Sequence, residues 1–302
     1  LKTHEYCYII SVCSLPSYTD KNLMNTLDQL KSGKLKGATN FKYSGELTSI
    51  PEELFDLSES LELLDLSGNK LSSLPSDFAK FHKLKIVFFS DNLFTEFPEV
   101  LSKCPQLEMI GFKANQIKTV AENSIPLNCR WLILTNNRIE KLPDSIGKCL
   151  RLQKVMLAGN LLSSLPQTMA NCKNIELLRV SANKLNTLPD WLFTLPKLSW
   201  FAFSDNPCNK TVLKNDLRKI DWNDINIGEK LGEGASGIIS KAVLNGKNVA
   251  IKVFKGEVTS DGLPRSEMQA CTHAGKHKNL TTVIGEIKNH ENNKEGLVLE
   301  LI

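Results

Sequence analysis

The sequence lacks a long apolar run, and its cysteines show no spacing typical of a metal site. The longest apolar stretch near the N-terminus, residues 6–15, is interrupted by Ser11 and Ser14, whereas a membrane-spanning helix needs about 20 apolar residues. Lys2 supplies little of the charge that begins a signal peptide, and no small-residue cleavage site follows. No two of the eight cysteines form a C-x-x-C pair. We therefore expect no membrane span and no metal site.

A strong charge imbalance is also absent. The net charge of +4 over 302 residues is too small to favour binding to nucleic acid or to an anionic membrane. The hydrophobic content of 41% and the charged content of 23% are typical of a soluble globular protein. The length allows about two domains of about 100 to 200 residues each.

What the sequence does contain is a column of asparagines with a regular period. Neighbours are 22 or 23 residues apart, and each holds the same place in the pattern L-x-x-L-x-L-x-x-N-x-L. This period is typical of a leucine-rich-repeat solenoid, an α/β fold in which each repeat adds one strand to a curved parallel sheet in a right-handed superhelix. Chance clustering of leucine would have to keep one phase seven times. The column is Asn69, Asn92, Asn115, Asn137, Asn160, Asn183 and Asn206.

The repeat also predicts which side chains are buried. Each asparagine is expected to bond neighbouring backbone as the chain turns, forming a ladder. Two columns of residues before it should face the core. The first is Leu64, Val87, Ile110, Leu132, Val155, Leu178 and Phe201, and the second is Leu66, Phe89, Phe112, Leu134, Leu157, Val180 and Phe203.

Five cysteines fall on core positions of the repeat. Cys104, Cys149 and Cys172 each lie eleven residues before a ladder asparagine, while Cys129 and Cys208 hold leucine positions. A free cysteine behaves as a small buried hydrophobe, so all five are expected to be core thiols. Reduced thiols favour a reducing compartment, and we expect a cytoplasmic protein.

The repeat phase divides the chain into four parts. Residues 1–23 match nothing repetitive and are expected to be a disordered extension, with Met24 as a candidate start. Residues 24–208 form the predicted repeat domain. It begins with a cap helix at 25–31 and a degenerate first repeat at 35–57 that carries Gly45 in place of the asparagine. Residues 209–223 are predicted to be a linker, and 224–302 form a second unit.

The strand positions between the core columns should face the concave side of the sheet, because strand side chains alternate. This face is rich in apolar and aromatic residues, which mark interaction sites when they are exposed. We predict a protein-binding surface here. The alternative is that these side chains pack on one another across the strands. The predicted binding residues are Leu63, Ile86, Phe88, Met109, Trp131, Ile133, Met156, Leu177 and Trp200.

After residue 224 the pattern changes to strand, glycine turn and strand. The motif Gly232-x-Gly234-x-x-Gly237 is followed by a hairpin turn at Asn245 and then by a strand that contains Lys252. Such a loop binds dinucleotides when a helix follows it, but here a strand follows. Glycines let backbone N–H groups approach phosphate oxygens, and a lysine ammonium suits the same oxygens.

These features resemble the small lobe of a protein kinase. From residue 24 to the end, including LGEGASGII and TSDGLPRSEM, the chain resembles the bacterial-type leucine-rich-repeat protein kinases. The resemblance implies an α+β lobe in which Lys252 pairs with Glu267 to bind ATP for catalysis. The alternatives are a strand lysine that extends into solvent and a solvated helix carboxylate. Ser236 departs from the aromatic at the loop tip of many kinases. The implied ATP contacts are Leu231, Gly232, Gly234, Gly237, Ile239, Ala250, Lys252, the gatekeeper Leu299, and Glu300 and Ile302 through their backbone.

The chain ends on an apolar strand, before a catalytic loop or magnesium ligands of such a kinase could occur. We therefore expect a fragment, inactive alone, of a longer signalling kinase that transfers phosphoryl groups from ATP to serine or threonine of a protein substrate. Its Mg²⁺ ligands would lie beyond residue 302. The main alternative is a pseudokinase scaffold that uses its repeats to bind proteins. A dinucleotide sensor is a third, weaker one.

Overall fold

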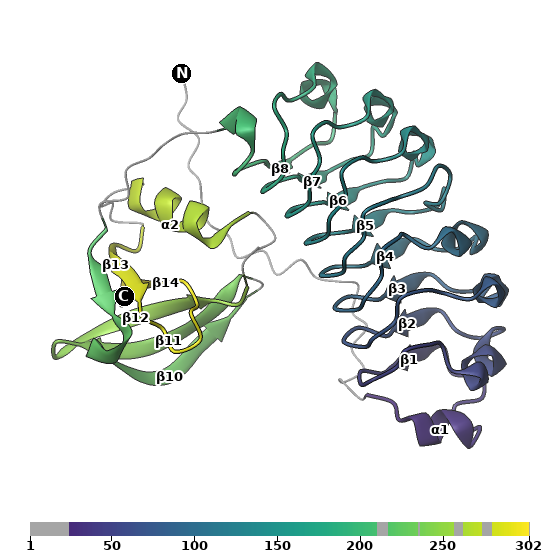
Figure 1. The fold of residues 1–302 in the computed structure, drawn as a ribbon, viewed down its shortest axis with the longest axis horizontal. Helices are drawn as coiled ribbons and strands as arrows, with labels where there is room; N and C mark the ends of the chain where they lie inside the picture. Colours follow the sequence, from purple (N-terminus) through teal and green to yellow (C-terminus); the bar gives the residue numbers. More distant parts are fainter. Residues whose placement is uncertain (1–23, 210–216, 235, 257–261, 274–279, 302) are drawn as a thin grey trace.

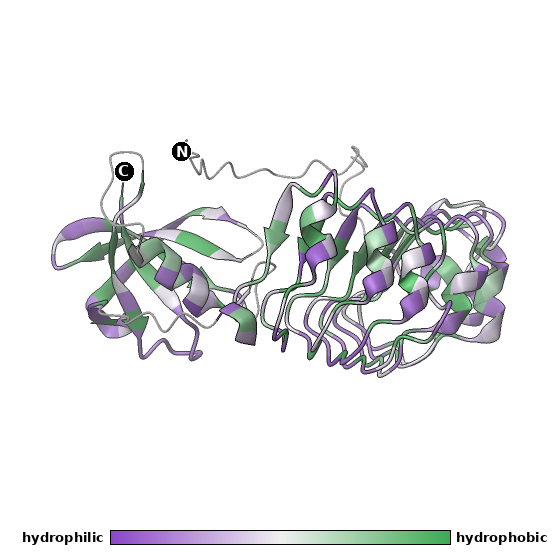
Figure 2. Cartoon of the chain, turned by 90° about the horizontal axis from the view of Figure 1, so that it is seen from above, coloured by the Kyte–Doolittle hydropathy of each residue, from purple (hydrophilic) through white to green (hydrophobic). Residues whose placement is uncertain are grey.

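The computed structural model describes residues 24–209, 217–234, 236–256, 262–273 and 280–301, so the predicted extension at 1–23 lies outside it. Two sheets are present in the described chain, one of eight strands and one of six. Figure 1 shows the first sheet along the inner side of an arc, with short helices along its outer side. Figure 2 shows the two sheets end to end along the long axis of the molecule. No described helix is long and apolar enough to cross a membrane.

The first sheet confirms the solenoid prediction. It is entirely parallel, runs in chain order, and each strand has three residues. Asn40 pairs with Leu63, an offset of 23 residues. After the strand, the Lys70 N–H bonds the Leu47 carbonyl as the Leu93 N–H bonds that of Leu71, so Gly45 stands at the ladder position as predicted. The strands are β1 (Asn40–Lys42), β2 (Leu63–Asp65), β3 (Ile86–Phe88), β4 (Met109–Gly111), β5 (Trp131–Ile133), β6 (Lys154–Met156), β7 (Leu177–Arg179) and β8 (Trp200–Ala202).

The convex side carries short 3-10 helices rather than the α-helices of the predicted β–α superhelix. A proline stands directly before each of η1 to η6, where its fixed φ presets the first turn. A 3-10 helix rises about 2.0 Å per residue against about 1.5 Å in an α-helix, so a short segment spans more of the convex side. These helices are η1 (Glu52–Leu57), η2 (Ser76–Lys80), η3 (Glu99–Lys103), η4 (Asp144–Lys148), η5 (Gln167–Asn171) and η6 (Asp190–Thr194), and η7 (Pro207–Asn209) follows β8.

The asparagine ladder is formed as predicted, and all seven side chains are buried. In the middle of the column, the Asn137 amide donates to the carbonyls of Phe112 at 2.8 Å and Leu134 at 3.0 Å. Its Oδ1 accepts from Ile117 N–H at 3.0 Å. Each asparagine therefore joins its own repeat to the one before it, and it satisfies backbone groups that would otherwise be buried without partners.

The residue before each ladder asparagine has a left-handed backbone. Its φ lies between 53° and 70° in all seven repeats, at Gly68, Asp91, Ala114, Asn136, Gly159, Ala182 and Asp205. Glycine and asparagine favour this conformation, but alanine and aspartate also hold it here. This position turns the chain from strand to convex side, and its side chain varies freely.

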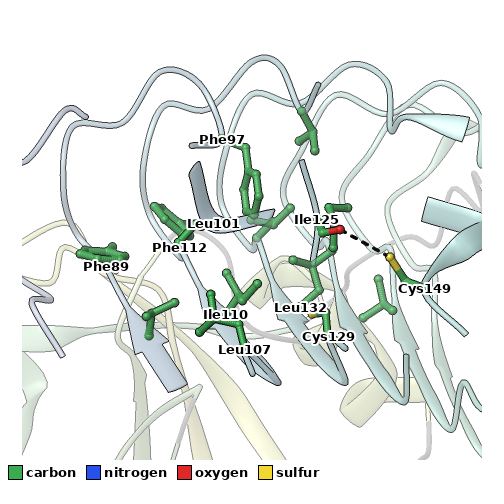
Figure 3. Close-up of a cluster of buried hydrophobic side chains, with 14 of the residues drawn as sticks. Phe89, Phe97, Leu101, Leu107, Ile110, Phe112, Ile125, Cys129, Leu132 and Cys149 are labelled. Carbon is green, nitrogen blue, oxygen red and sulfur yellow. Dashed lines mark hydrogen bonds between the residues drawn. The ribbon is translucent and has the colours of Figure 1, made fainter. Parts of the chain in front are cut away.

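Both predicted core columns are fully buried from β2 to β7. At the centre, the Phe112 ring lies 5.1 Å from Phe89 and 5.0 Å from Phe94 between centroids. Figure 3 shows this cluster and the contact of Cys149 Sγ with the Ile125 carbonyl at 3.9 Å. In the last repeat Phe201 and Phe203 are only partly buried, because no further described repeat covers them.

Four of the five predicted core thiols, Cys104, Cys129, Cys149 and Cys172, are buried. Burial raises the pKa of the Cys104, Cys149 and Cys172 thiols to about 11, so they stay protonated near neutral pH. The prediction for Cys208 is wrong: it is exposed. Cys208 belongs to the last repeat, so the leucine position that it occupies is not covered by a further described repeat.

The open end of the solenoid is closed as predicted by helix α1 (Leu27–Lys31). Thr26 and Gln29 form a capping box, in which each side chain bonds the other's backbone N–H. This arrangement satisfies the first free donors of the helix. Leu30 is buried against the solenoid core.

The second sheet begins earlier than the predicted linker allows. Strand β9 (Lys219–Asp221) pairs in parallel with β13, and η8 (Trp222–Asp224) then leads into β10. The strand order is β10-β11-β12-β14-β13-β9. Positive φ at Asn245 and Gly246 makes the predicted tight hairpin. The strands are β10 (Ile225–Glu233), β11 (Gly237–Leu244), β12 (Lys247–Phe254), β13 (Val283–Lys288) and β14 (Gly296–Glu300).

Helix α2 (Pro264–His273) packs on one face of this sheet. Its Met268 is buried with Phe254 and Leu297. The opposite face has its own core, which includes Ile251 and Val298. Because strand side chains alternate, Lys252 lies on the face that α2 covers.

Candidate functional site

The concave surface, defined by the nine predicted binding residues, is less open than the sequence suggested. Met109 is buried, at 9% exposure, and among the nine only Trp200 is exposed, at 45%. The Phe88 ring covers Gly111, where an added Cβ would lie 2.6 Å from the ring. The alternative prediction of packing across the strands therefore holds near β3 and β4. The other seven residues are half-buried.

The part of the concave surface between β5 and β8 combines aromatic rings with cations. Lys154 Nζ lies 3.8 Å from the centroid of the Trp131 ring, and Arg179 lies 5.3 Å from the Trp200 ring. Trp131 and Lys154 are direct partners in the β5–β6 register. Cation–π contacts of this kind contribute about 0.5–1 kcal/mol when exposed. The sequence prediction missed Lys154 and Arg179 because it selected apolar residues alone, although both stand in the same columns.

A row of ion pairs flanks the strands on their N-terminal side. Lys85 pairs with Glu62 at 2.9 Å, and Arg130 with Glu108 at 3.3 Å. Each of the four side chains is more than a third exposed to solvent, so each ion pair contributes little to stability.

In the second sheet the structure brings four of the predicted nucleotide contacts, Ile239, Ala250, Lys252 and Leu299, onto one face. Ile239 pairs with Lys252, and Ala250 pairs with Leu299. Ala250 is buried and Leu299 is half-buried. Leu231 is exposed at 48%, Glu300 is exposed, and Ile302 lies outside the described residues. Ile239, Ala250 and Leu299 form a small apolar floor on the face that carries Lys252.

Lys252 and Glu267 are in contact, on β12 and α2. Lys252 Nζ forms an ion pair with Glu267 Oε1, and the two side chains are 16% and 27% exposed. Lys252 also lies 5.1 Å from the Phe254 ring centroid. The lysine is therefore not directed freely into solvent, and the carboxylate is not a solvated helix residue. The pair holds a cation at the edge of the apolar floor.

The glycine hairpin between β10 and β11 has two kinds of glycine. A Cβ on Gly237 would lie 2.6 Å from the Val253 carbonyl oxygen. Close packing against β12 is therefore enough to require glycine at this position. A Cβ on Gly232 or Gly234 would meet nothing within 4 Å, so packing does not require glycine at either position, and the Gly234 N–H donates to the Gly237 carbonyl at 3.0 Å. The described residues on the face that carries Lys252 thus combine its cation with apolar side chains.

An ion pair joins the hairpin to the residue that directly follows β12. Glu233 forms ion pairs with Lys230 and Lys255. Hydrogen bonds from Lys230 and Lys255 lower the pKa of the Glu233 carboxyl to about 2, so it remains ionised at physiological pH. A depression of about 600 Å³ lies nearby, between Phe254, the start of α2 and the β13–β14 turn. It includes none of the predicted nucleotide contacts.

Comparison with known proteins identifies the repeats. Two leucine-rich-repeat family models match, at residues 128–185 and 60–81. The mouse leucine-rich repeat and calponin homology domain-containing protein 1 is 30% identical over 33% of this chain and 14% of its own length. A probable inactive serine/threonine-protein kinase, roco10 of Dictyostelium discoideum, is 27% identical over 47% of this chain and 5% of its own. This chain therefore matches only a small part of each relative.

A solved structure supports the same fold. In the Toll–Spätzle complex of Drosophila, the similar chain aligns with a TM-score of 0.50 and 22% identity. The alignment covers 57% of this chain and 27% of that one. At this identity the likeness concerns the fold alone. Both family-model matches lie within the eight-stranded sheet's repeats, so they establish a leucine-rich-repeat solenoid and leave the second sheet to be interpreted from its geometry.

Proposed function

We propose that this chain, a leucine-rich-repeat protein with a solenoid-like parallel sheet, is a scaffold that holds a partner protein on its concave surface. The observation that carries the proposal is the paired arrangement of Trp131 and Trp200, each beside a cation. They occupy the same column three strands apart, which corresponds to about 14 Å at the usual strand spacing. Two tryptophans at this separation suit one extended or helical segment of a partner.

Several further points support this function. Tryptophan and arginine are the residues most enriched among binding hot spots. The similar solved chain belongs to a structure of the Toll–Spätzle complex. The four buried thiols fit a reducing compartment, and we place the scaffold in the cytoplasm. A scaffold needs only surfaces that the described residues present.

The test compares variants in which large side chains are removed from opposite sides of the solenoid. Trp131→Ala with Trp200→Ala is expected to weaken partner capture at least tenfold, because each truncation removes an aromatic anchor of the concave surface. The matched control is Phe193→Ala on η6, whose side chain is 75% exposed on the convex side. Quantitative mass spectrometry of proteins retained by each immobilised variant is the measurement. If the double variant retains every partner of the parent, the proposal is wrong.

We propose as a second function that the second sheet binds Mg²⁺–ATP, as the small lobe of a protein kinase does. The Lys252–Glu267 ion pair beside the apolar side chains of Ile239, Ala250 and Leu299 is the observation that favours it. Lys252 would neutralise phosphate oxygens, Glu267 would orient Lys252, and Ile239, Ala250 and Leu299 would contact the adenine. Bound ATP would supply the phosphoryl group for transfer. Kinase activity of the whole protein, directed to serine or threonine of a protein substrate, rests on this second proposal.

A further inference from the structure

A direct contact joins the last repeat of the solenoid to helix α2. Asp205 Oδ2 accepts a hydrogen bond from the Leu263 backbone N–H at 3.2 Å, and Oδ1 accepts one from the Ser266 hydroxyl at 2.5 Å. Leu263 directly precedes α2, and Ser266 lies in its first turn. Figure 1 shows α2 on the side of the second sheet next to β8. The two bonds thus span both units of the chain.

The approach of the two units is close at Gly262. Its φ is +138°, and an added Cβ would lie 2.5 Å from Ser204 Oγ, 3.1 Å from Asp205 Oδ2 and 3.3 Å from Ser181 Cβ. A side chain at this position would be strained by the backbone and blocked by the last two repeats. Gly262 is buried. The two units are therefore in close backbone contact here, and the contact does not depend on one long side chain that extends from one unit to the other.

Asp205 differs from its counterparts in the other repeats. It holds the left-handed position before the ladder asparagine, where Ala114 and Ala182 show that no functional group is needed for the turn. Asp91 has the same residue type and nearly the same φ, 53° against 59°, but its side chain is exposed. The carboxylate of Asp205 is thus not explained by the solenoid fold.

The carboxylate is placed where a helix needs one. The first N–H groups of a helix lack partners within the helix, and a side-chain oxygen from a neighbouring residue usually supplies one. Here the oxygen comes from another unit, and its negative charge also suits the positive end of the helix. Glu267 follows Ser266 directly. The same turn that Asp205 holds therefore carries the carboxylate that pairs with Lys252.

We propose that Asp205 is a positioning residue, through which the solenoid caps α2 and holds Glu267 against Lys252. The proposal deepens the second proposed function and rests on it for its effect on nucleotide binding. The capping contact itself does not depend on any ligand. Because β8 and Trp200 belong to the same repeat as Asp205, the concave surface and the Lys252 face are linked through one short segment.

The test measures amide hydrogen exchange in α2 of the full 302-residue chain. Asp205→Ala is expected to speed exchange in the first turns of α2 about tenfold, as loss of a capping group typically does. Asp91→Ala, the matched control, should leave α2 unchanged. Asp205→Asn keeps one acceptor oxygen and should give an intermediate rate. If Asp205→Ala does not fold, Ser266→Ala removes one of the two bonds from the other side and should also speed exchange.

Mg²⁺–ATP titration of the same variants separates the two proposals. Faster α2 exchange with weaker nucleotide binding in Asp205→Ala supports both. Faster exchange without nucleotide binding by any variant supports the capping role and contradicts the nucleotide function. Unchanged α2 exchange in both Asp205→Ala and Ser266→Ala overturns the inference, whether or not nucleotide binds.

Discussion

Replacing Asn137 by alanine is expected to lower the free energy of unfolding by about 3–5 kcal/mol. The variant loses bonds to the Phe112 and Leu134 carbonyls and to Ile117 N–H, all of which are buried. Alanine offers no polar group in return, and water has no access to replace the amide. The Ile117 N–H loses its partner, which costs about 1–3 kcal/mol. The Phe112 and Leu134 carbonyls keep bonds from the two neighbouring ladder asparagines, and each loses a bond that contributes about 1 kcal/mol. The loss affects two neighbouring repeats, because the ladder joins them.

Urea unfolding followed by tryptophan fluorescence measures this effect. At a slope of about 2–3 kcal/mol/M, the midpoint should fall by about 1–2 M. The control is Asn136→Ala, one residue earlier, where the side chain is exposed and φ is 57°. Because Ala114 and Ala182 already hold this position, the control should cost about 1 kcal/mol or less. Equal midpoints for the two variants would show that the ladder does not stabilise the solenoid as described.

Replacing Lys252 by alanine is expected to weaken Mg²⁺–ATP binding about 100-fold. The variant would lose charge-assisted hydrogen bonds to phosphate oxygens, which contribute about 1.5–3 kcal/mol. It would also leave the Glu267 carboxylate without its ion-pair partner, so a negative charge would then face the anionic phosphates. Both effects act in the same direction.

Titration calorimetry with a non-hydrolysable ATP analogue and Mg²⁺ is the measurement. Lys247→Ala is the control, because Lys247 lies on the same strand and its side chain is exposed. Circular dichroism confirms that each variant keeps its structure. Equal affinity of the parent and the Lys252 variant would refute the assigned role of Lys252. Absence of binding by the parent would refute the nucleotide function itself.

The repeat could be predicted from the sequence because its signal is periodic and local. One phase, read from seven asparagines, placed two buried columns and four buried thiols. The prediction failed only in the last repeat, where Cys208 is exposed because no further described repeat covers it.

The remaining features depend on contacts that no pattern records. The concave surface is less exposed near β4 because the Phe88 ring lies over Gly111. This depends on the side-chain conformation of Phe88, which the repeat pattern does not record. Strand β9 has only three residues, and β13, its partner, follows more than 60 residues later. The Asp205 contact joins residues 58 and 61 positions apart. The Lys252–Glu267 contact was predicted only because the surrounding motif resembles a kinase lobe.

The most direct test of the scaffold function is site-specific photo-crosslinking. A photoreactive phenylalanine derivative is placed at Ile133 or Met156 on the concave surface, and at Phe193 on η6 as the convex control. The account predicts that both concave positions crosslink the partner whose capture is lost in the Trp131→Ala, Trp200→Ala variant, and that Phe193 does not. Crosslinking of that partner from Phe193, with none from Ile133 or Met156, would contradict it.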